Sequence, residues 1–306
     1  MKLFTYLIQE RKTVGAEKDG VAVDLTEAHD WFTRENGESL FSGSEITTDM
    51  LALIHAGEAA WLGLEQLFSW LFAQDPPMPD HLSLQLENIK CAAPILNPSK
   101  IVCVGLNYQD HCEETGTPVP EKPIFFCKFP SSITGPNDPV SWPPGSSTQV
   151  DYEAELAVVI KKSCKEISPE QAWNYVAGYT ILNDISARDA QFSDGQWIRG
   201  KSFDSFCPMG PYIVTPEEVG NPDNLTIRCR LNGELMQDSN TGKMIFKLPE
   251  LISYLSQTIT LEPGDILSTG TPHGVGFSRT PPIYLKPGDQ VEVEIENLGV
   301  LRNFVA

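Results

Sequence analysis

The chain has 306 residues, of which 41% are hydrophobic and 21% are charged, and its formal net charge is −19. This composition is ordinary for a globular protein, and the net charge makes nucleic acid and anionic membrane surfaces poor partners. No stretch reaches the roughly 18 apolar residues of a membrane-spanning helix. The seven cysteines include no C-x-x-C pair. Free, mostly buried thiols in a reducing compartment are therefore expected, either the cytoplasm or, if a transit peptide has been removed, the mitochondrial matrix.

The first third of the chain shows the periodicities of both strands and helices. The predicted elements are a hairpin over 1–25 with its turn at 17–20, a helix from a cap at 47–49 to His55, and a helix from Ala59 to Phe72. The proline cluster at 76–79 is expected to break the chain after them. We therefore predict a small N-terminal α+β domain over residues 1–95.

From Lys100 the pattern changes to short strands separated by Gly and Pro turns. Strands are predicted at 101–106, 125–129, 152–160, 180–184, 265–270 and 291–305, and helices at 168–173 and 248–256. Asn232-Gly233 predicts the turn of a further hairpin over 225–237, and the segment between Asp184 and Phe206 reads as a loop. We predict a β-rich second domain over residues 96–306.

Three carboxylates occur in apolar surroundings. Glu153 and Glu155 alternate within the predicted strand 152–160, so both should project from one face, and Asp184 ends another apolar run. Burying adjacent carboxylates without compensation is costly. A divalent cation removes the cost, and three oxygen donors are a common cage for Mg²⁺ or Mn²⁺. The pattern therefore indicates a metal-dependent enzyme.

Each of these residues also has a simpler explanation. A strand with one solvated face alternates glutamate with apolar residues in the same way. Asp184 could instead cap a helix or belong to a turn. The metal site is favoured only when the remaining polar segments are considered together with these three residues.

A second polar segment follows the predicted strand 101–106. His111 and Glu114 are three residues apart, so they share a face of one helical turn. A carboxylate beside an imidazole raises its pKa and fixes its tautomer, which makes a water-activating base. An ordinary contact at the start of a surface helix is the alternative.

Further candidates lie in the last third of the chain. Arg188 offers a bidentate grip on a carboxylate, and Lys201 is a point charge that could stabilise an enolate. Gln191 could orient a water or substrate oxygen. Thr271 lies in a small-residue loop whose N–H groups and hydroxyl could face an anion. Taken singly, the charged residues could equally be solvated, and the loop could be a structural turn. P-loop, H-E-x-x-H, G-x-S-x-G and strand-borne G-x-G-x-x-G motifs are absent.

The motifs resemble, in order and spacing, those of the fumarylacetoacetate hydrolase family. The segments that carry the resemblance are 101–111, 151–160, 183–191, 200–211, 231–237 and 268–276. Within that family the chain resembles the group formed by fumarylacetoacetate hydrolase domain-containing protein 2 and its bacterial relatives. The resemblance implies a mixed β-sandwich or β-roll fold and a homodimer. It also implies a cofactor, Mg²⁺ or Mn²⁺, with Ca²⁺ able to take the site in crystals.

By motif match, the metal ligands would be Glu153, Glu155 and Asp184, and the base pair would be His111 with Glu114. Lys201 would act at the substrate, and the weaker matches Arg188, Gln191 and Thr271 would bind it. The family's namesake has an aspartate ligand where this chain has Asn107, which favours the smaller relatives that process acylpyruvates, oxaloacetate or related 2-oxo acids.

The reaction expected from these residues passes through a metal-bound enolate of a 2-oxo acid. Because His111 and Glu114 suit water activation, hydrolysis of a C–C bond in an acylpyruvate is the first expectation. Enol–keto tautomerisation or decarboxylation of oxaloacetate, and isomerisation of a 2-hydroxy-diene-dioate, use the same enolate. A non-catalytic protein that binds a metal and a 2-oxo acid is an alternative of another class.

Overall fold

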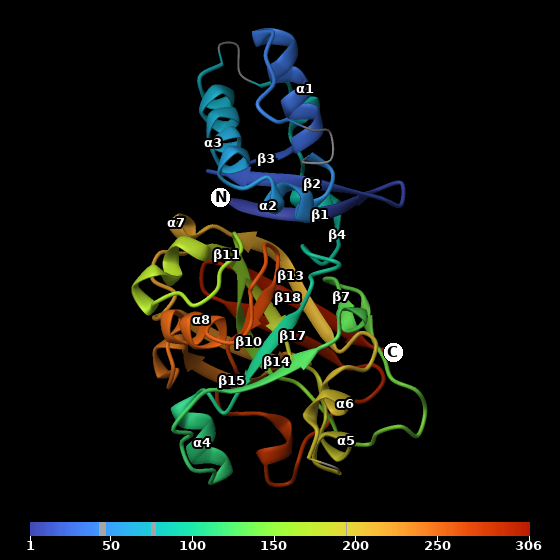
Figure 1. The fold of residues 1–306 in the computed structure, drawn as a ribbon. Helices are drawn as coiled ribbons and strands as arrows, with labels where there is room; N and C mark the ends of the chain where they lie inside the picture. The colour runs from blue at the N-terminus through green and yellow to red at the C-terminus, as the bar shows by residue number, and fades with distance from the viewer. Residues whose placement is uncertain (43–46, 75–77, 194) are drawn as a thin grey trace.

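The computed structural model describes residues 1–42, 47–74, 78–193 and 195–306. Its helices are α1 (Leu25–Asn36), α2 (Met50–His55), α3 (Glu58–Phe72), α4 (Gln109–Thr115), α5 (Arg188–Ser193), α6 (Trp197–Lys201), α7 (Pro216–Val219) and α8 (Leu248–Ser256). In Figure 1 the first three helices and strands β1 to β3 form the upper part of the molecule, and the later elements form a broader body below. The structure is a sheet-rich α+β fold, which confirms the predicted fold class.

The strands form two large sheets and one small one. The large sheet has eleven strands among the described residues. Nine of them follow the order β3 (Val21–Asp24), β2 (Arg11–Lys18), β1 (Lys2–Ile8), β13 (Cys207–Val214), β11 (Val176–Asn183), β10 (Ala154–Ile160), β16 (Ile266–Ser268), β5 (Ile101–Gly105), β6 (Ile124–Lys128). Of the other two, β4 (Lys90–Cys91) pairs with β1, and β7 (Ile133–Thr134) pairs with β13. The five-stranded sheet follows the order β15 (Glu234–Asn240), β14 (Thr226–Leu231), β17 (Gln290–Ile295), β18 (Gly299–Val305), β8 (Pro139–Val140), and β9 (Val150–Asp151) pairs with β12 (Ser186–Ala187). The chain therefore brings β10 and β11 to the middle of the large sheet.

Strand β10 is buried on both faces, as its central position requires. Leu156, Val158 and Ile160 pack in one hydrophobic cluster together with residues of the five-stranded sheet. Ala157 and Val159 point to the opposite face, into a second cluster shared with the N-terminal strands and helices. Because side chains alternate along a strand, two separate cores fix the register of β10 and hold its first residues rigidly.

Several predicted elements are confirmed. α2, α3 and α8 match the predicted helices, and the hairpin of β14 and β15 turns at Asn232-Gly233, both with positive φ. A 3₁₀ helix with a capping box at Ser168 begins where the helix at 168–173 was predicted. Of the predicted proline break, Pro76 and Pro77 lie outside the described residues. The division at residue 95 stays a prediction, although β1 also pairs with β13 of the body.

Other predictions were incomplete or wrong. The N-terminal hairpin has a third strand, β2, between its two predicted halves, and Leu25 begins helix α1 rather than ending a strand. The segment between Asp184 and Phe206, expected to be a loop, contains α5 and α6. The predicted strand 152–160 is shorter in the structure, because β10 begins two residues later, at Ala154. These differences arise from contacts between distant parts of the chain, which the local sequence pattern does not reveal.

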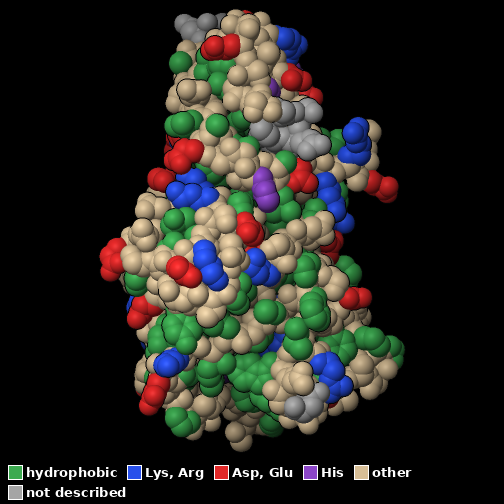
Figure 2. Space-filling view, in the orientation of Figure 1, with side chains coloured by type: hydrophobic (Ala, Val, Ile, Leu, Met, Phe, Trp, Pro, Cys, Tyr) green, Lys and Arg blue, Asp and Glu red, His purple; other side chains and the backbone are tan. Residues whose placement is uncertain are grey.

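The surface and the cysteines agree with a globular protein. Every cysteine is free, and only Cys127 is exposed, which confirms the prediction of mostly buried thiols. No helix in the described part of the chain is long and apolar enough to cross a membrane. On the face drawn in Figure 2, apolar side chains gather over the lower half of the molecule. Such patches can be contact surfaces, but the homodimer stays a prediction.

Helix α1 depends on one buried aspartate. Asp24 accepts the N–H of Glu27 at 3.0 Å as the N-cap, and also the hydroxyls of Tyr6 at 2.6 Å and Thr13 at 3.1 Å. We predict that Asp24→Ala lowers the free energy of unfolding by about 3 kcal/mol, because it removes a cap and leaves the buried Tyr6 hydroxyl unpaired.

The matched control for this prediction is Asp49→Ala, at the exposed cap of α2, where the side chain accepts the N–H of Ala52 at 2.9 Å. That change should cost about 1 kcal/mol in urea unfolding. Equal losses in the two variants would contradict the assignment of Asp24 as a three-way acceptor.

Candidate active site

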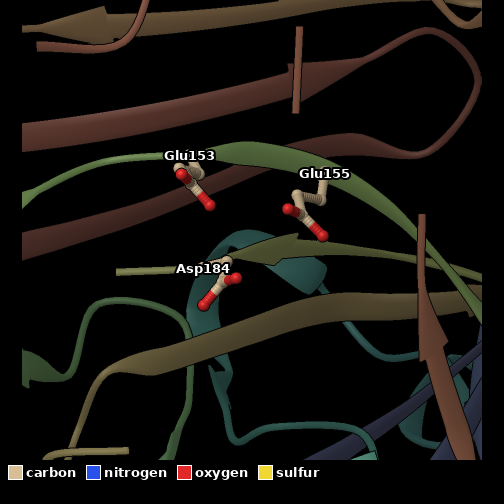
Figure 3. Close-up of side chains that lie close together, drawn as sticks. All are labelled: Glu153, Glu155 and Asp184. Atoms are coloured by element: carbon tan, nitrogen blue, oxygen red, sulfur yellow. The ribbon is translucent and has the colours of Figure 1, made fainter. Parts of the chain in front are cut away.

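Three carboxylates meet at the end of the central strands. Glu153, Glu155 and Asp184 each offer an oxygen, and these oxygens lie within 4.8 Å of one another. Figure 3 shows the three side chains pointing into one space. Glu155 lies on β10, Glu153 precedes it, and Asp184 follows β11; the backbone N–H of Asp184 donates to the Glu153 carbonyl at 2.9 Å. The pairing of β10 with β11 therefore places all three together.

The triad is buried, so its simpler explanations fail. Glu153 is 5% exposed, Glu155 1% and Asp184 0%. The solvated-face alternative for the two glutamates is therefore wrong. Asp184 is not a helix cap, because its carboxylate is held by two lysine side chains.

Buried cations surround the triad. Lys201 Nζ donates to Glu153 Oε2 at 2.6 Å and to Asp184 Oδ2 at 2.8 Å, and Arg188 Nη2 lies 2.7 Å from Glu153 Oε1. Lys128 Nζ donates to Asp184 Oδ1 at 2.6 Å and to the Lys201 carbonyl. Arg188 and Lys201 are 3% and 2% exposed, so neither is a solvated surface charge. Sequence reasoning missed Lys128, whose only signal was a lysine in the apolar run 124–129.

The charges of the site do not balance. Four buried carboxylates (Asp151, Glu153, Glu155, Asp184) face three buried cations (Lys128, Arg188, Lys201). Burial raises the pKa of Glu155, and the nearby charges of Asp184 and Glu153 raise it further. Burial also opposes the charge on Glu153, but Arg188 and Lys201 outweigh it and lower the pKa of this carboxyl. Glu155 thus carries the charge that the protein compensates least.

The residues present fit a divalent cation. The donors are hard carboxylate oxygens, which Mg²⁺ and Mn²⁺ prefer. Glu155 accepts hydrogen bonds from Ser268 Oγ and from the Gly270 N–H, both through Oε2, which leaves Oε1 for a ligand. A cation there would supply the missing positive charge. The triad is therefore a candidate metal site, with Lys201 as the neighbour whose amine must share or yield its carboxylate contacts.

Glu153 and Glu155 of the triad line a cavity of about 300 Å³. The other predicted site residues that line it are His111, Arg188, Gln191, Lys201 and Thr271. Aromatic side chains form much of the remaining wall, namely Phe126, Phe192, Trp197 and Phe277. The structure thus brings every predicted site residue except Glu114 and Asp184 to the lining of one cavity. Asp184 lies behind this lining, in contact with Lys201.

Two of these side chains are already engaged by neighbouring residues. Gln191 accepts from Arg188 Nη1 at 3.0 Å, and the Thr271 hydroxyl accepts from Gln237 Nε2 at 2.8 Å. Gln237 also accepts the N–H of Ala154 and donates to the Pro272 carbonyl, so it ties the loop of Thr271 to β10. Sequence reasoning missed Gln237, because nothing marks a strand glutamine as buried.

Helix α4 places His111 in the cavity and holds the loop around His273. The Nδ1 of His111 lies 3.6 Å from Glu114 Oε2, longer than a hydrogen bond, and Glu114 instead accepts the N–H of Gly274 at 3.0 Å. Asp110 accepts from Nδ1 of His273 at 2.9 Å. The expected closeness of His111 and Glu114 is confirmed, and Glu114 has the additional task of clamping the loop.

Asn107 performs a structural task. Its amide donates to the Thr269 carbonyl at 2.8 Å and to the Phe246 carbonyl at 3.2 Å, and its Oδ1 accepts the N–H of Phe246 at 2.9 Å. The side chain therefore joins the strand end of β5 to the loop after β16.

Comparison with known proteins gives a consistent result. Residues 100–306 match the family described as fumarylacetoacetate (FAA) hydrolase C-terminal. The chain is 54% identical over 214 residues to oxaloacetate tautomerase Fahd2a, mitochondrial, of Rattus norvegicus, which covers 70% of this chain and 68% of the rat protein.

Solved structures agree over the whole chain. A fumarylacetoacetate hydrolase from Exiguobacterium antarcticum is 35% identical with a TM-score of 0.80, covering 100% of this chain and 99% of that one. A 2-hydroxyhepta-2,4-diene-1,7-dioate isomerase from Mycobacterium marinum is 32% identical with a TM-score of 0.71, covering 100% and 98%. The rat relative is mitochondrial by name, and the cytoplasmic location expected for this chain stays a prediction.

The candidate metal site makes a direct prediction. Glu155→Gln keeps the shape of the side chain but removes one negative ligand, so the affinity for Mn²⁺ measured by calorimetry should fall at least about tenfold. The exposed Glu234→Gln serves as the control and should bind Mn²⁺ like the unmodified protein. Unchanged affinity in Glu155→Gln would remove this residue from the site.

The clamp formed by Asp110 and Glu114 of helix α4 on the loop of His273 and Gly274 makes a prediction about pH. Partial burial opposes the charge on Asp110, but hydrogen bonds from Ser239, His273 and Lys243 outweigh it and lower its pKa below the ordinary 3.8. Since the folded protein holds this carboxylate ionised, its stabilisation is present above that ordinary value and is lost as the pH falls through the folded pKa. Asp110→Asn should therefore destabilise the protein at pH 7 by about 1–2 kcal/mol and by less at pH 3.

Urea unfolding of both proteins at the two pH values measures this difference. The exposed Asp204→Asn is the control, for which we expect the same small effect at both pH values. A destabilisation by Asp110→Asn that does not change with pH would contradict an ionised Asp110 in the clamp.

Proposed function

The chain belongs to the fumarylacetoacetate hydrolase family, and from this premise we propose that it is a divalent-cation-dependent enzyme that interconverts the enol and keto forms of a small 2-oxo acid, with oxaloacetate as the first candidate. The observation that carries the proposal is that Glu153, Glu155, Lys201 and His111 line one cavity, with Asp184 completing the triad behind it. The rat relative is named for oxaloacetate tautomerisation, and a structural neighbour for isomerisation of a related dioate. Both names describe rearrangements without loss of carbon.

In this proposal the carboxylate and the 2-oxo group of the substrate bind beside the triad. When bound, a divalent cation held by Glu153, Glu155 and Asp184 supplies Lewis-acid polarisation of the 2-oxo group. Lys201 lies between Glu153 and Asp184 and can donate to an oxygen on which negative charge develops. Arg188 is fixed by Glu153 and Gln191 at the same wall of the cavity. These residues favour an enolate over the neutral ketone.

Tautomerisation requires the transfer of one proton. The enol O–H loses a proton, C3 gains one, and no water is consumed. His111 is placed to move it, because its side chain lines the cavity beside Glu153 and Glu155. Its Nδ1 is buried, has no hydrogen-bond partner among the residues that the structure describes, and lies 3.6 Å from Glu114 Oε2. His111 is therefore the proposed general base.

Hydrolysis of an acylpyruvate is the second candidate, and the aromatic wall favours it. Phe126, Phe192 and Trp197 offer apolar surface to an acyl chain. His111 would then take a proton from water, the resulting hydroxide would attack the distal carbonyl, and the bond between C3 and that carbon would break to leave a pyruvate enolate and a carboxylic acid. The same residues serve both reactions, so an assay must separate them.

An ultraviolet assay with Mg²⁺ on enol-oxaloacetate and acetylpyruvate tests the proposal. We predict rapid loss of the enol signal, its suppression by EDTA, and a loss of about 10²-fold in turnover for His111→Ala with Mn²⁺ affinity retained. The exposed His55→Ala is the control and should be fully active. Cleavage of acetylpyruvate without acceleration of the enol reaction would replace the first candidate by the second, and activity on neither would overturn the proposed function.

A further inference from the structure

Asp151 is a fully buried carboxylate next to the site, and sequence reasoning gave it no role. It is 0% exposed and does not line the cavity. Its Oδ2 accepts from Arg188 Nε at 3.0 Å, from Arg188 Nη2 at 2.8 Å and from the Phe277 N–H at 3.1 Å. Its Oδ1 accepts the N–H groups of Gly276 at 2.7 Å and of Tyr152 at 2.9 Å. Every partner of this carboxylate is therefore a donor.

The loop that contacts Asp151 has no room for a side chain at Gly276. A Cβ placed on Gly276 would lie 2.6 Å from Asp151 Oδ1 and 1.9 Å from the Ile283 carbonyl. Glycine is thus required for the loop to approach the carboxylate. The next residue is Phe277, and the centroid of its ring lies 4.4 Å from Cζ of Arg188. The guanidinium is consequently held by Asp151 and by an aromatic ring of the cavity wall.

Arg188 has a second carboxylate within reach, and this one belongs to the triad. Its Nη2 lies 2.7 Å from Glu153 Oε1 and 2.8 Å from Asp151 Oδ2. The guanidinium therefore divides its charge between the two carboxylates. Without the charge of Asp151, the whole attraction of Arg188 would fall on Glu153, and in a buried site such attraction is strong.

We propose that Asp151 is a positioning residue that holds the Arg188 guanidinium against Phe277 and so keeps Glu153 available as a ligand for a divalent cation. The inference rests on the proposed function only in taking the triad as a cation site. Asp151 touches neither the cavity nor the triad carboxylates directly, and it acts through Arg188. An amide at this position carries no charge and can offer an acceptor oxygen to only one of the two sets of donors that now meet Oδ1 and Oδ2. The hold on the guanidinium would weaken, and Arg188 would turn to Glu153.

Calorimetric titration with Mn²⁺ tests this role in four proteins: the unmodified chain, Asp151→Asn, Arg188→Met, and the double variant. Asp151→Asn should weaken Mn²⁺ binding by about tenfold or more. In the double variant no guanidinium remains to compete for Glu153, so the affinity should return to within about threefold of the unmodified protein, and the KM for enol-oxaloacetate should equal that of Arg188→Met.

The control is Asp265→Asn, a buried aspartate outside the cavity that accepts from Ser99, the Lys100 N–H and the Glu262 N–H. It should lose stability but keep its Mn²⁺ affinity within about twofold, since it has no link to the triad. This control separates a loss of metal binding from a general loss of packing.

Unchanged Mn²⁺ affinity in Asp151→Asn, or a double variant as weak as Asp151→Asn, would overturn the inference. If Asp151→Asn does not fold by circular dichroism, the double variant decides, because removing both members of a buried pair is better tolerated than removing one. An affinity near that of the unmodified protein supports the inference, and a tenfold loss overturns it. Because the titration contains no substrate, failure of the tautomerase assay would overturn the proposed function and leave this result standing.

Discussion

The structure of the site depends on one constraint, that three carboxylates are buried with oxygens within 4.8 Å of one another. Such a cluster is tolerated only with compensating cations. Lys128, Arg188 and Lys201 supply three, but Asp151 adds a fourth carboxyl group, so one carboxyl group is left without a cation of its own. With all four carboxylates ionised, a divalent cation would give the site a net positive charge, which suits an anionic 2-oxo acid. The same imbalance thus accounts for both the expected cofactor and the expected substrate.

The fold brings these charges together from distant parts of the chain. β10 and β11 pair in the middle of the large sheet and carry the triad, with cores on both faces to hold them. Lys128 comes from the end of the edge strand β6, and Arg188 and Lys201 come from α5 and α6. The loop of Thr271 is tied to this frame by Gln237 and by helix α4. Each charged group is therefore fixed by backbone that is itself packed.

Part of this arrangement could be predicted from the sequence, because some signals are local. Alternation of Glu153 and Glu155 in an apolar run, the hairpin at Asn232-Gly233 and helix α8 all follow from spacing within a few residues. Lys128 and Asp151 could not be predicted, since a single charge in an apolar run becomes meaningful only when its partner, 56 or 37 positions away, is known. Helix α5 was missed because it begins at Arg188, directly after the two-residue strand β12. The residue before it is Ala187, whose side chain cannot accept a capping hydrogen bond. The triad was found because its three members share one chemical type, and Arg188 and Lys201 were found with it as candidate substrate residues. Their pairing with the triad, and the third cation Lys128, are revealed only by the tertiary structure.

The central claim is that the triad holds a divalent cation. Anomalous diffraction from crystals of the full chain soaked in Mn²⁺ tests it most directly. The account predicts one strong peak in contact with an oxygen from each of Glu153, Glu155 and Asp184, with Lys201 no longer bridging Glu153 and Asp184. An absence of a peak between these carboxylates, with the Lys201 amine still bound to both, would show that the lysines alone neutralise the triad and would contradict a metal-dependent reaction.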